Sequence, residues 1–162
     1  VMRDGKLVQF GTQDQIYRRP ATTYVATFVG KPRMSLVEGA LSVENGIALL
    51  SAPGGVRIPL GAPGALGLAG VGPPEKVAMG VRAEDVRVDA GAGALEGGFP
   101  ATVALLEPIG SDTFVELSLG DSTIVARVSP DLPLAIGQPV TAAVAPGRQH
   151  LFDAVTGNRI GN

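Results

Sequence analysis

The chain has 162 residues, a formal net charge of −2 and 4% aromatic residues. Nucleic-acid-binding domains normally carry a basic face and aromatic stacking surfaces, so this composition argues against a nucleic-acid partner. The sequence has no cysteine and one histidine, His150, which excludes disulfides and thiolate sites and leaves little basis for a metal site or a catalytic triad. The 23 glycines and 13 prolines, with 45% hydrophobic residues, are typical of many short strands joined by tight turns.

The chain is predicted to begin with a β-hairpin and a short helix. Asp4-Gly5 favours a two-residue hairpin turn, because both residues tolerate the positive φ that such a turn requires. Thr12 and Gln15 have the spacing of a capping box, so a helix is expected to begin after Thr12. Pro20 is expected to stop that helix.

A second short helix is predicted from residue 22 or 23 to residue 29, with Gly30 as its C-cap. Its apolar residues recur at helical spacing and should form one buried stripe. That stripe consists of Tyr24, Val25, Phe28 and Val29.

From about residue 35 the apolar residues recur with a period of two, which indicates β-strands. Strands are predicted over residues 36–41, 47–51, 56–60, 76–82, 85–88, 101–107, 113–119, 123–128, 140–144 and 149–152. Asn45-Gly46 and Gly120-Asp121 have the composition of hairpin turns. The Gly- and Pro-rich stretch 61–75 is predicted to be a flexible crossover, and residues 90–98 a boundary between two barrel halves. The residues alone therefore predict a mainly β fold, built as a small barrel or sandwich.

The sequence lacks the motifs of several enzyme classes. A phosphate-binding P-loop requires Gly-Lys followed by Ser or Thr, but Gly5-Lys6 precedes Leu7 and Gly30-Lys31 precedes Pro32. No dinucleotide fingerprint lies between a strand and a helix, and no G-x-S-x-G nucleophile motif occurs. We therefore interpret the chain as a binding, docking or regulatory module rather than an enzyme, with no catalytic residue.

Two pairs of polar residues have types that carry chemistry elsewhere. Ser111 with His150 would suit nucleophilic catalysis, and Glu84 with Asp85 would suit acid chemistry. A lone histidine is usually structural, and adjacent carboxylates at a strand end are usually solvated. The structural interpretation is therefore favoured for both pairs.

Four segments, in order along the chain, resemble ATP-binding subunits of ABC importers of the maltose and sugar-phosphate type. The first covers residues 1–39, and the second is MGVRAEDV (79–86), where Ala83 and Asp85 replace the usual proline and histidine. The others are EPIGSDTFVEL (107–117) and GRQHLFDAVTGNRI (147–160). In the first segment the matching residues are Asp4, Gly5, Gln9, Gly11, Thr12, Ile16, Tyr17, Pro20, Val25, Ala26, Phe28 and Gly30.

This resemblance implies a domain organisation and a fold. Residues 1–30 would be the end of an ATPase domain, a β-hairpin plus two short helices. Residues 31–162 would be a TOBE regulatory domain of two interleaved OB-like halves, about 31–98 and 99–162. The expected fold class is thus mainly β, with OB-fold-like small barrels preceded by the hairpin and helices.

The resemblance also implies a parent function. Such subunits bind ATP and Mg²⁺, hydrolyse ATP, and pair as homodimers under membrane-spanning permease subunits at the cytoplasmic face of the inner membrane. The motifs for hydrolysis lie upstream in the family and are absent from these 162 residues. We therefore expect the chain to be the C-terminal portion of such a subunit, for sugars or glycerol phosphate, and to hold no cofactor and hydrolyse no ATP by itself.

Polar residues at strand ends and in the resembling motifs are candidate contacts for a ligand or partner. They are Arg82, Glu84, Asp85, Gly110, Ser111, Asp112, Thr113, Arg148 and His150. The competing interpretation gives each a structural role. Arg82 would pair with Glu84 or Glu107 at the junction of the barrels, residues 110–112 would form a turn, and His150 would make a local hydrogen bond.

Two functions from different classes remain open. The chain could be the regulatory and dimerisation domain of an importer subunit, or a free-standing OB-like module that binds a small anion or an oligosaccharide. Anion binding ranks lower, because Arg82, Arg87, Arg127 and Arg148 are not expected to form a concentrated basic cluster.

The first 30 residues are expected to present an apolar patch and an unpaired strand edge. We predict that this patch packs against a second copy of the chain. The residues of the patch are Leu7, Val8, Phe10, Ile16, Tyr17, Tyr24, Phe28 and Val29.

Overall fold

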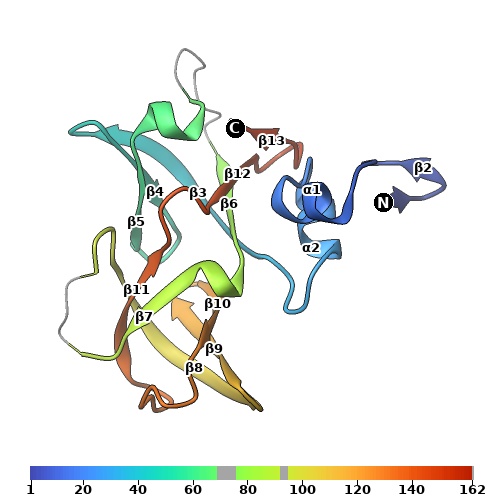
Figure 1. The fold of residues 1–162 in the computed structure, drawn as a ribbon. Helices are drawn as coiled ribbons and strands as arrows, with labels where there is room; N and C mark the ends of the chain where they lie inside the picture. Colours follow the sequence, from blue (N-terminus) through green and yellow to red (C-terminus); the bar gives the residue numbers. More distant parts are fainter. Residues whose placement is uncertain (69–75, 92–94, 162) are drawn as a thin grey trace.

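The computed structural model describes residues 1–68, 76–91 and 95–161. A small N-terminal unit (residues 1–30) lies beside two larger antiparallel sheets, and its two helices pack near β6 and β12 (Figure 1). The elements of the N-terminal unit are β1 (Met2–Arg3), β2 (Lys6–Leu7), α1 (Gln13–Arg18) and α2 (Thr23–Phe28).

The two sheets share the remainder of the chain, which we call the barrel unit (residues 35–161). The six-stranded sheet has the order β13-β12-β6-β3-β4-β5 and the five-stranded sheet the order β10-β9-β8-β11-β7. The first contains β3 (Ser35–Glu44), β4 (Ile47–Ser51), β5 (Arg57–Gly61), β6 (Val77–Val81), β12 (His150–Asp153) and β13 (Arg159–Ile160). The second contains β7 (Val86–Asp89), β8 (Phe99–Ile109), β9 (Asp112–Leu119), β10 (Ser122–Val128) and β11 (Pro139–Val144).

The chain exchanges strands between the two sheets. β7 leaves the six-stranded sheet to pair with β11, and β12 returns after β11 to pair with β6. A strand from residues 31–98 therefore belongs to the sheet of residues 99–144, and the reverse exchange occurs at the C-terminus. The mainly β, OB-like class predicted from the sequence is confirmed.

All of the predicted strands are present, with ends that differ by at most three residues. The hairpin turns are confirmed as well: Asp4 and Gly5 have φ values of 49° and 75°, and Asn45 and Gly46 have 50° and 78°. The capping box of α1 is present in full, with Gln15 N–H donating to Thr12 Oγ1 and Thr12 N–H donating to Gln15 Oε1.

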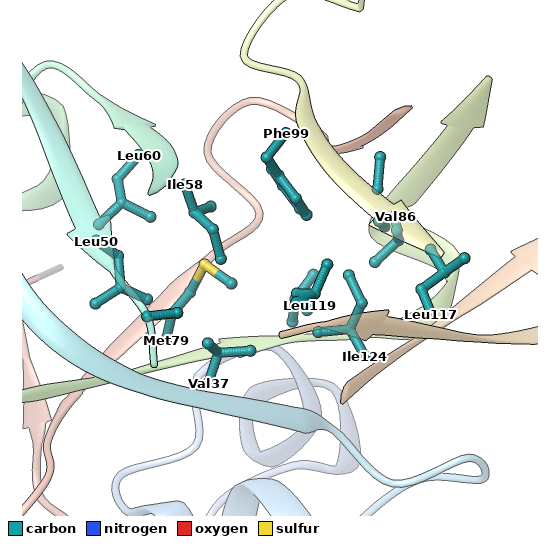
Figure 2. Close-up of a cluster of buried hydrophobic side chains, with 14 of the residues drawn as sticks. Val37, Leu50, Ile58, Leu60, Met79, Val86, Phe99, Leu117, Leu119 and Ile124 are labelled. Atoms are coloured by element: carbon teal, nitrogen blue, oxygen red, sulfur yellow. The ribbon is translucent and has the colours of Figure 1, made fainter. Parts of the chain in front are cut away.

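One continuous hydrophobic core joins the two sheets (Figure 2). Val37, Leu50 and Met79 come from the six-stranded sheet, and Leu117 and Ile124 from the five-stranded sheet; all five are fully buried. Alternate residues of β9 face this core, as a strand with one polar face requires. Burying one large apolar side chain stabilises the folded state by about 1.5–3 kcal/mol, so this core is the main stabilising feature of the barrel unit.

β6 is buried on both faces, which explains its uninterrupted apolar sequence VAMGV. Met79 faces the main core, whereas Ala78 packs in a second cluster with Ala26 of α2, Met34 and Phe152. Gly80 lies at this contact, where an added Cβ would come within 2.5 Å of Met34 Sδ. α2 is thus attached to the outer face of the six-stranded sheet.

Two details of α2 differ from the sequence predictions. α2 buries Val25 and Ala26, whereas Phe28 is 63% exposed and stacks on Tyr24, so the expected buried stripe is wrong by about one residue. The small Ala26 is the residue that allows the helix to approach the sheet. Val29, in an extended conformation, is the C-cap, and Gly30 follows it.

The predicted loop at 61–75 includes a short 3-10 helix, Pro63–Leu66, which begins at Pro63 and is capped by Gly67 in a left-handed conformation. Residues 69–75 of that loop, and 92–94 of the loop at 90–98, lie outside the described residues. Within the described ranges, no helix has both the length and the apolar character needed to cross a bilayer.

Candidate functional site

A cavity of about 550 Å³ lies between α1 of the N-terminal unit and the barrel unit. Five of the nine predicted contact residues line it, namely Arg82, Glu84, Asp85, Arg148 and His150. Arg82 directly follows β6, Glu84 and Asp85 lie in the 3-10 turn Ala83–Asp85, and the other two lie just before and at the start of β12. The other lining residues are Asp14, Gln15, Tyr17, Arg18, Arg19, Ala65, Leu66, Gly147, Gln149, Leu151, Arg159 and Ile160.

Arg82 is the buried centre of the wall, with 3% of its surface exposed. Its Nη1 donates to the carbonyl oxygen of Val29 at 2.8 Å and its Nη2 to that of Tyr17 at 2.9 Å. Its guanidinium also lies over the Tyr17 ring, 3.6 Å from the centroid. Arg82 therefore fastens the ends of both N-terminal helices to the barrel unit.

The predicted partners of Arg82, Glu84 and Glu107, are wrong: no carboxylate within the described ranges pairs with it. Helix C-termini carry unsatisfied carbonyl groups, and an arginine is a suitable donor to them. Gly30 makes room for this contact, since a Cβ there would come within 2.8 Å of Arg82 Nη1. Burial lowers the pKa of Arg82, yet arginine stays protonated in proteins.

Glu84 is an exposed residue that binds Tyr17 instead. The Tyr17 hydroxyl donates to Glu84 Oε1 at 2.5 Å. Burial, and next this hydrogen bond, raise the pKa of Tyr17 to about 12, while the positive charge of Arg82 opposes the shift. Arg82, Tyr17 and Glu84 thus form one connected unit, which we call the Arg82 clamp.

Asp85 and Arg148 face each other more loosely, with 3.7 Å between Arg148 Nε and Asp85 Oδ1. Burial and the nearby charge of Glu84 raise the pKa of Asp85, and Arg148 lowers it. The backbone carbonyl of Asp85 accepts a hydrogen bond from the N–H of Ala145, which fixes the 3-10 turn against the end of β11.

His150 contacts Arg159, with 3.0 Å between Arg159 Nη1 and His150 Nδ1. Because a guanidinium only donates, Nδ1 must be the acceptor and the imidazole proton must be on Nε2. Burial, then the charges of Arg159 and Arg82, lower the pKa of His150 to about 4. His150 is therefore neutral at pH 7, and its local hydrogen bond is the structural role expected from the sequence.

The remaining four predicted residues, Gly110, Ser111, Asp112 and Thr113, do not join the cavity. Gly110 and Ser111 form the turn between β8 and β9, and Asp112 and Thr113 begin β9, at the far end of the five-stranded sheet (Figure 1). Gly110 has a φ of 59°, and the Ser111 hydroxyl donates to Asp112. The turn interpretation fits this geometry, and a Ser111–His150 catalytic pair does not, since Ser111 lies outside the cavity that His150 lines and His150 contacts Arg159 instead.

Sequence reasoning missed the cavity residues Tyr17, Arg18, Arg19 and Arg159. The sequence showed Arg18 and Arg19 as the end of a helix. The residues of the opposite cavity wall, such as Glu84, lie more than 60 residues away along the chain, so the sequence did not show that the two walls meet. The four arginines that were weighed from the sequence do not gather in one place, but a different set of arginines does. Arg87 and Arg127 lie elsewhere, whereas Arg18, Arg19, Arg82, Arg148 and Arg159 all line this cavity.

Residues 79–152 match the TOBE domain family. This segment is a TOBE domain. It contains Arg82, which follows β6, and Arg148 and His150, just before and at the start of β12, so the barrel wall of the cavity is mostly TOBE sequence.

Curated relatives extend the likeness to the whole chain. The sn-glycerol-3-phosphate import ATP-binding protein UgpC of Salmonella typhi is 36% identical over 160 residues, which cover 99% of this chain and 42% of that protein. UgpC of Escherichia coli K12 is 31% identical with the same coverage. The sulfoquinovosyl glycerol transport ATP-binding protein SmoE of Agrobacterium fabrum is 33% identical over 96% of this chain.

The chain therefore spans about two fifths of the length of the curated relatives it matches, their C-terminal part. Among solved structures, the cytoplasmic molybdate-binding protein ModG has a TM-score of 0.53 and 21% identity, covering 72% of this chain and 93% of its own. At that identity the likeness is one of fold, and it supports the OB-type architecture of the barrel unit.

Proposed function

We propose that this chain acts as the regulatory and dimerisation region of the ATP-binding subunit of an ABC importer, for sugars or glycerol phosphate. The observation that carries the proposal is the Arg82 clamp, because it joins the N-terminal unit to the TOBE domain through buried contacts. The similarity to import ATP-binding proteins over 99% of the chain supports the same assignment.

The clamp suits a regulatory region mechanically. Main-chain hydrogen bonds add to it: Thr23 N–H donates to the carbonyl of Gly157, and Arg159 N–H to that of Ala21. A movement of the helices in an importer subunit would therefore be passed to the TOBE domain, and a partner bound to the TOBE domain would bias the helices. ATP and Mg²⁺ would be bound by the remainder of such a subunit.

The outer face of the N-terminal unit supports a partner surface. Four large apolar residues of this unit are 60–89% exposed, namely Met2, Leu7, Phe10 and Phe28. Single exposed apolar residues are common on a monomer, but several in one small unit are typical of a surface that contacts a partner. We propose a second copy of the chain as one partner, and membrane-spanning permease subunits as partners of the complete subunit, at the cytoplasmic side of the inner membrane. Light scattering that finds only monomer at high concentration would contradict the self-association.

A chimera tests the importer role. Residues 1–162 replace the matching segment of Escherichia coli UgpC in a strain that lacks UgpC, and uptake of radiolabelled sn-glycerol 3-phosphate is measured. We expect uptake well above that of UgpC shortened by the same segment, and a loss when the chimera carries Arg82→Met. Equal uptake from the shortened protein and the chimera, at equal expression, would refute the proposal.

The alternative function is a free-standing OB-like module for a small anion or an oligosaccharide. The arginine-lined cavity favours an anion over an oligosaccharide, because Tyr17 is the single aromatic residue among the described lining residues. The alternative leaves unexplained why the likeness to importer subunits extends through residues 1–30. Anion binding by the purified chain without any effect of the chimera on uptake would favour it.

A further inference from the structure

We propose that the cavity between α1 and the TOBE domain binds a small phosphate monoester, such as a sugar phosphate. Arg19 and Arg148 would hold the phosphate, and Leu66 and Ile160 would contact the organic part. The inference goes beyond the regulatory role and does not depend on it, because every residue concerned lies within this chain and binding is measurable without any transporter.

The charge of the cavity favours an anion. Among the described lining residues, five guanidinium groups face three carboxylates, and His150 adds no charge at pH 7. Two of the carboxylates are engaged: Asp14 accepts from Arg18 at 2.6 Å, and Glu84 accepts from the Tyr17 hydroxyl. The cavity therefore keeps an excess of positive charge close to one wall.

Arg19 and Arg148 are the arginines best placed to take a ligand. The exposed Arg19 side chain has no hydrogen bond or ion pair within the part of the chain that the structure describes. Burial, and next the charge of Arg19, lower the pKa of Arg159. The guanidinium groups of Arg19 and Arg159 are therefore close enough to repel each other. Arg148 meets Asp85 only through Nε at 3.7 Å, which leaves its terminal nitrogens available.

Phosphate matches this arrangement better than a carboxylate does. Arginine forks bind phosphate through parallel charged hydrogen bonds, and the two charges of a phosphate monoester can be shared by two arginines. The imidazole proton on His150 Nε2 supplies a neutral donor in the same cavity. Neither arginine needs to leave a buried bond, in contrast to Arg82.

The size and the apolar wall indicate an organic ligand rather than a bare oxyanion. Cavities of roughly 300–1,000 Å³ hold small organic molecules, and this cavity has about 550 Å³. Ala65, Leu66, Leu151 and Ile160 supply apolar surface. Leu66 and the C-terminal strand are in close contact, because a Cβ on Gly161 would meet the Leu66 carbonyl oxygen at 2.0 Å.

Isothermal titration of the full 162-residue chain at low salt tests the site. The ligands are glucose 6-phosphate, ribose 5-phosphate and glycerol 3-phosphate, with inorganic phosphate and glucose as references. We expect saturable binding of at least one ester, at least tenfold tighter than inorganic phosphate, and none of glucose. Arg19→Gln and Arg148→Gln should each weaken the ester by about tenfold or more, the loss expected for one charged hydrogen bond.

Arg57→Gln is the matched control, since Arg57 is an exposed arginine paired with Glu44 on another face of the molecule. It should leave ester binding unchanged, and thermal melts should show that all three variants fold. The proposal is overturned if no ester binds saturably, if phosphate binds as tightly as the esters, or if Arg57→Gln weakens binding as much as the cavity variants. None of these results alters the uptake test above.

Discussion

The N-terminal unit and the barrel unit differ in how they are stabilised. The barrel unit has a continuous core in which Leu117, Ile124 and Met79 are completely buried. The N-terminal unit has a two-stranded hairpin and two six-residue helices, and α1 has no buried residue. Helices of this length are not stable alone, so this unit must derive its order from contacts with the barrel unit.

This difference identifies the contacts that attach the N-terminal unit to the barrel unit. The barrel unit can fold around its own core, while the N-terminal unit depends on Arg82, on the Ala26–Phe152 cluster and on the main-chain bonds to residues 157–159. A small number of polar contacts and one small apolar cluster therefore hold the helices in place. Mutations should affect the two units to very different degrees.

The largest effect is expected from the barrel core. Leu117→Ala removes a fully buried side chain and should lower the free energy of unfolding by about 2–5 kcal/mol. Leu7→Ala, at a 65% exposed position of the hairpin, should change it by less than about 0.5 kcal/mol. Urea denaturation followed by circular dichroism measures both; similar losses for the two variants would mean that the hairpin contributes to the same core.

Arg82→Met should release α1 while leaving the barrel unit folded. The variant loses two charged, partly buried hydrogen bonds to main-chain carbonyls, at a cost of about 2–3 kcal/mol after the gain from removing a buried charge. Hydrogen exchange should accelerate at the amides of Ile16 and Arg19, which close the turns of α1. Amides of β9 should keep their protection.

Arg87→Met is the control for the arginine change, because Arg87 is an exposed residue of β7. It should leave exchange in α1 unchanged. If α1 keeps its protection in Arg82→Met, then α1 does not depend on the clamp, and the mechanical argument for a regulatory region fails.

Much of the fold could be predicted from the sequence because its signals are local. The Asp4-Gly5 and Asn45-Gly46 turns, the Thr12 capping box and the alternation in β9 each act over a few residues. The error at Phe28 has a different origin. Helical spacing identifies an apolar stripe but does not show that the close approach of β6 selects the small Ala26 as the buried residue.

The candidate site was harder to predict because its parts come from distant segments. Arg82 carried a motif signal, but its partners are main-chain carbonyls, which any sequence has. The cluster of arginines depends on α1 lying against β12 and β13, and the two-residue strand Arg159–Ile160 has no periodic signal of its own.

Acid should destabilise the barrel edge next to the N-terminal unit through His150. Its pKa is lowered to about 4 in the folded chain, from an ordinary value of 6.5. Between these values the unfolded chain binds more protons, so stability is full above pH 6.5 and falls as the pH decreases toward 4. After allowance for partial solvent screening, the loss should be about 1–3 kcal/mol.

The chain has one histidine, so its NMR titration reports this pKa directly. In His150→Gln the dependence of unfolding free energy on pH between 6.5 and 4 should become shallower. A histidine that titrates near 6.5 in the folded chain would contradict the acceptor role of Nδ1 toward Arg159.

Within the Arg82 clamp, the smaller effect is expected from Tyr17→Phe, which removes the hydroxyl bond to Glu84 and keeps the aromatic ring over Arg82. Loss of the hydroxyl bond to Glu84 should cost about 0.5–1 kcal/mol, far less than the loss of Arg82. The raised pKa of Tyr17, about 12 against 10.0, adds a pH dependence. The folded chain holds the phenolic proton more tightly, so stability is full below pH 10 and falls as the pH rises toward 12.

Denaturation at pH 9 and pH 11 therefore separates two contributions of Tyr17. In Tyr17→Phe the decrease between these pH values should be smaller than in the native chain, whereas the cation–π contact with Arg82 is retained at both. If Tyr17→Phe instead releases α1 as completely as Arg82→Met, the hydroxyl bond is as necessary for attaching the helix as the buried guanidinium. The two contacts would then act as one unit, and neither would hold α1 alone.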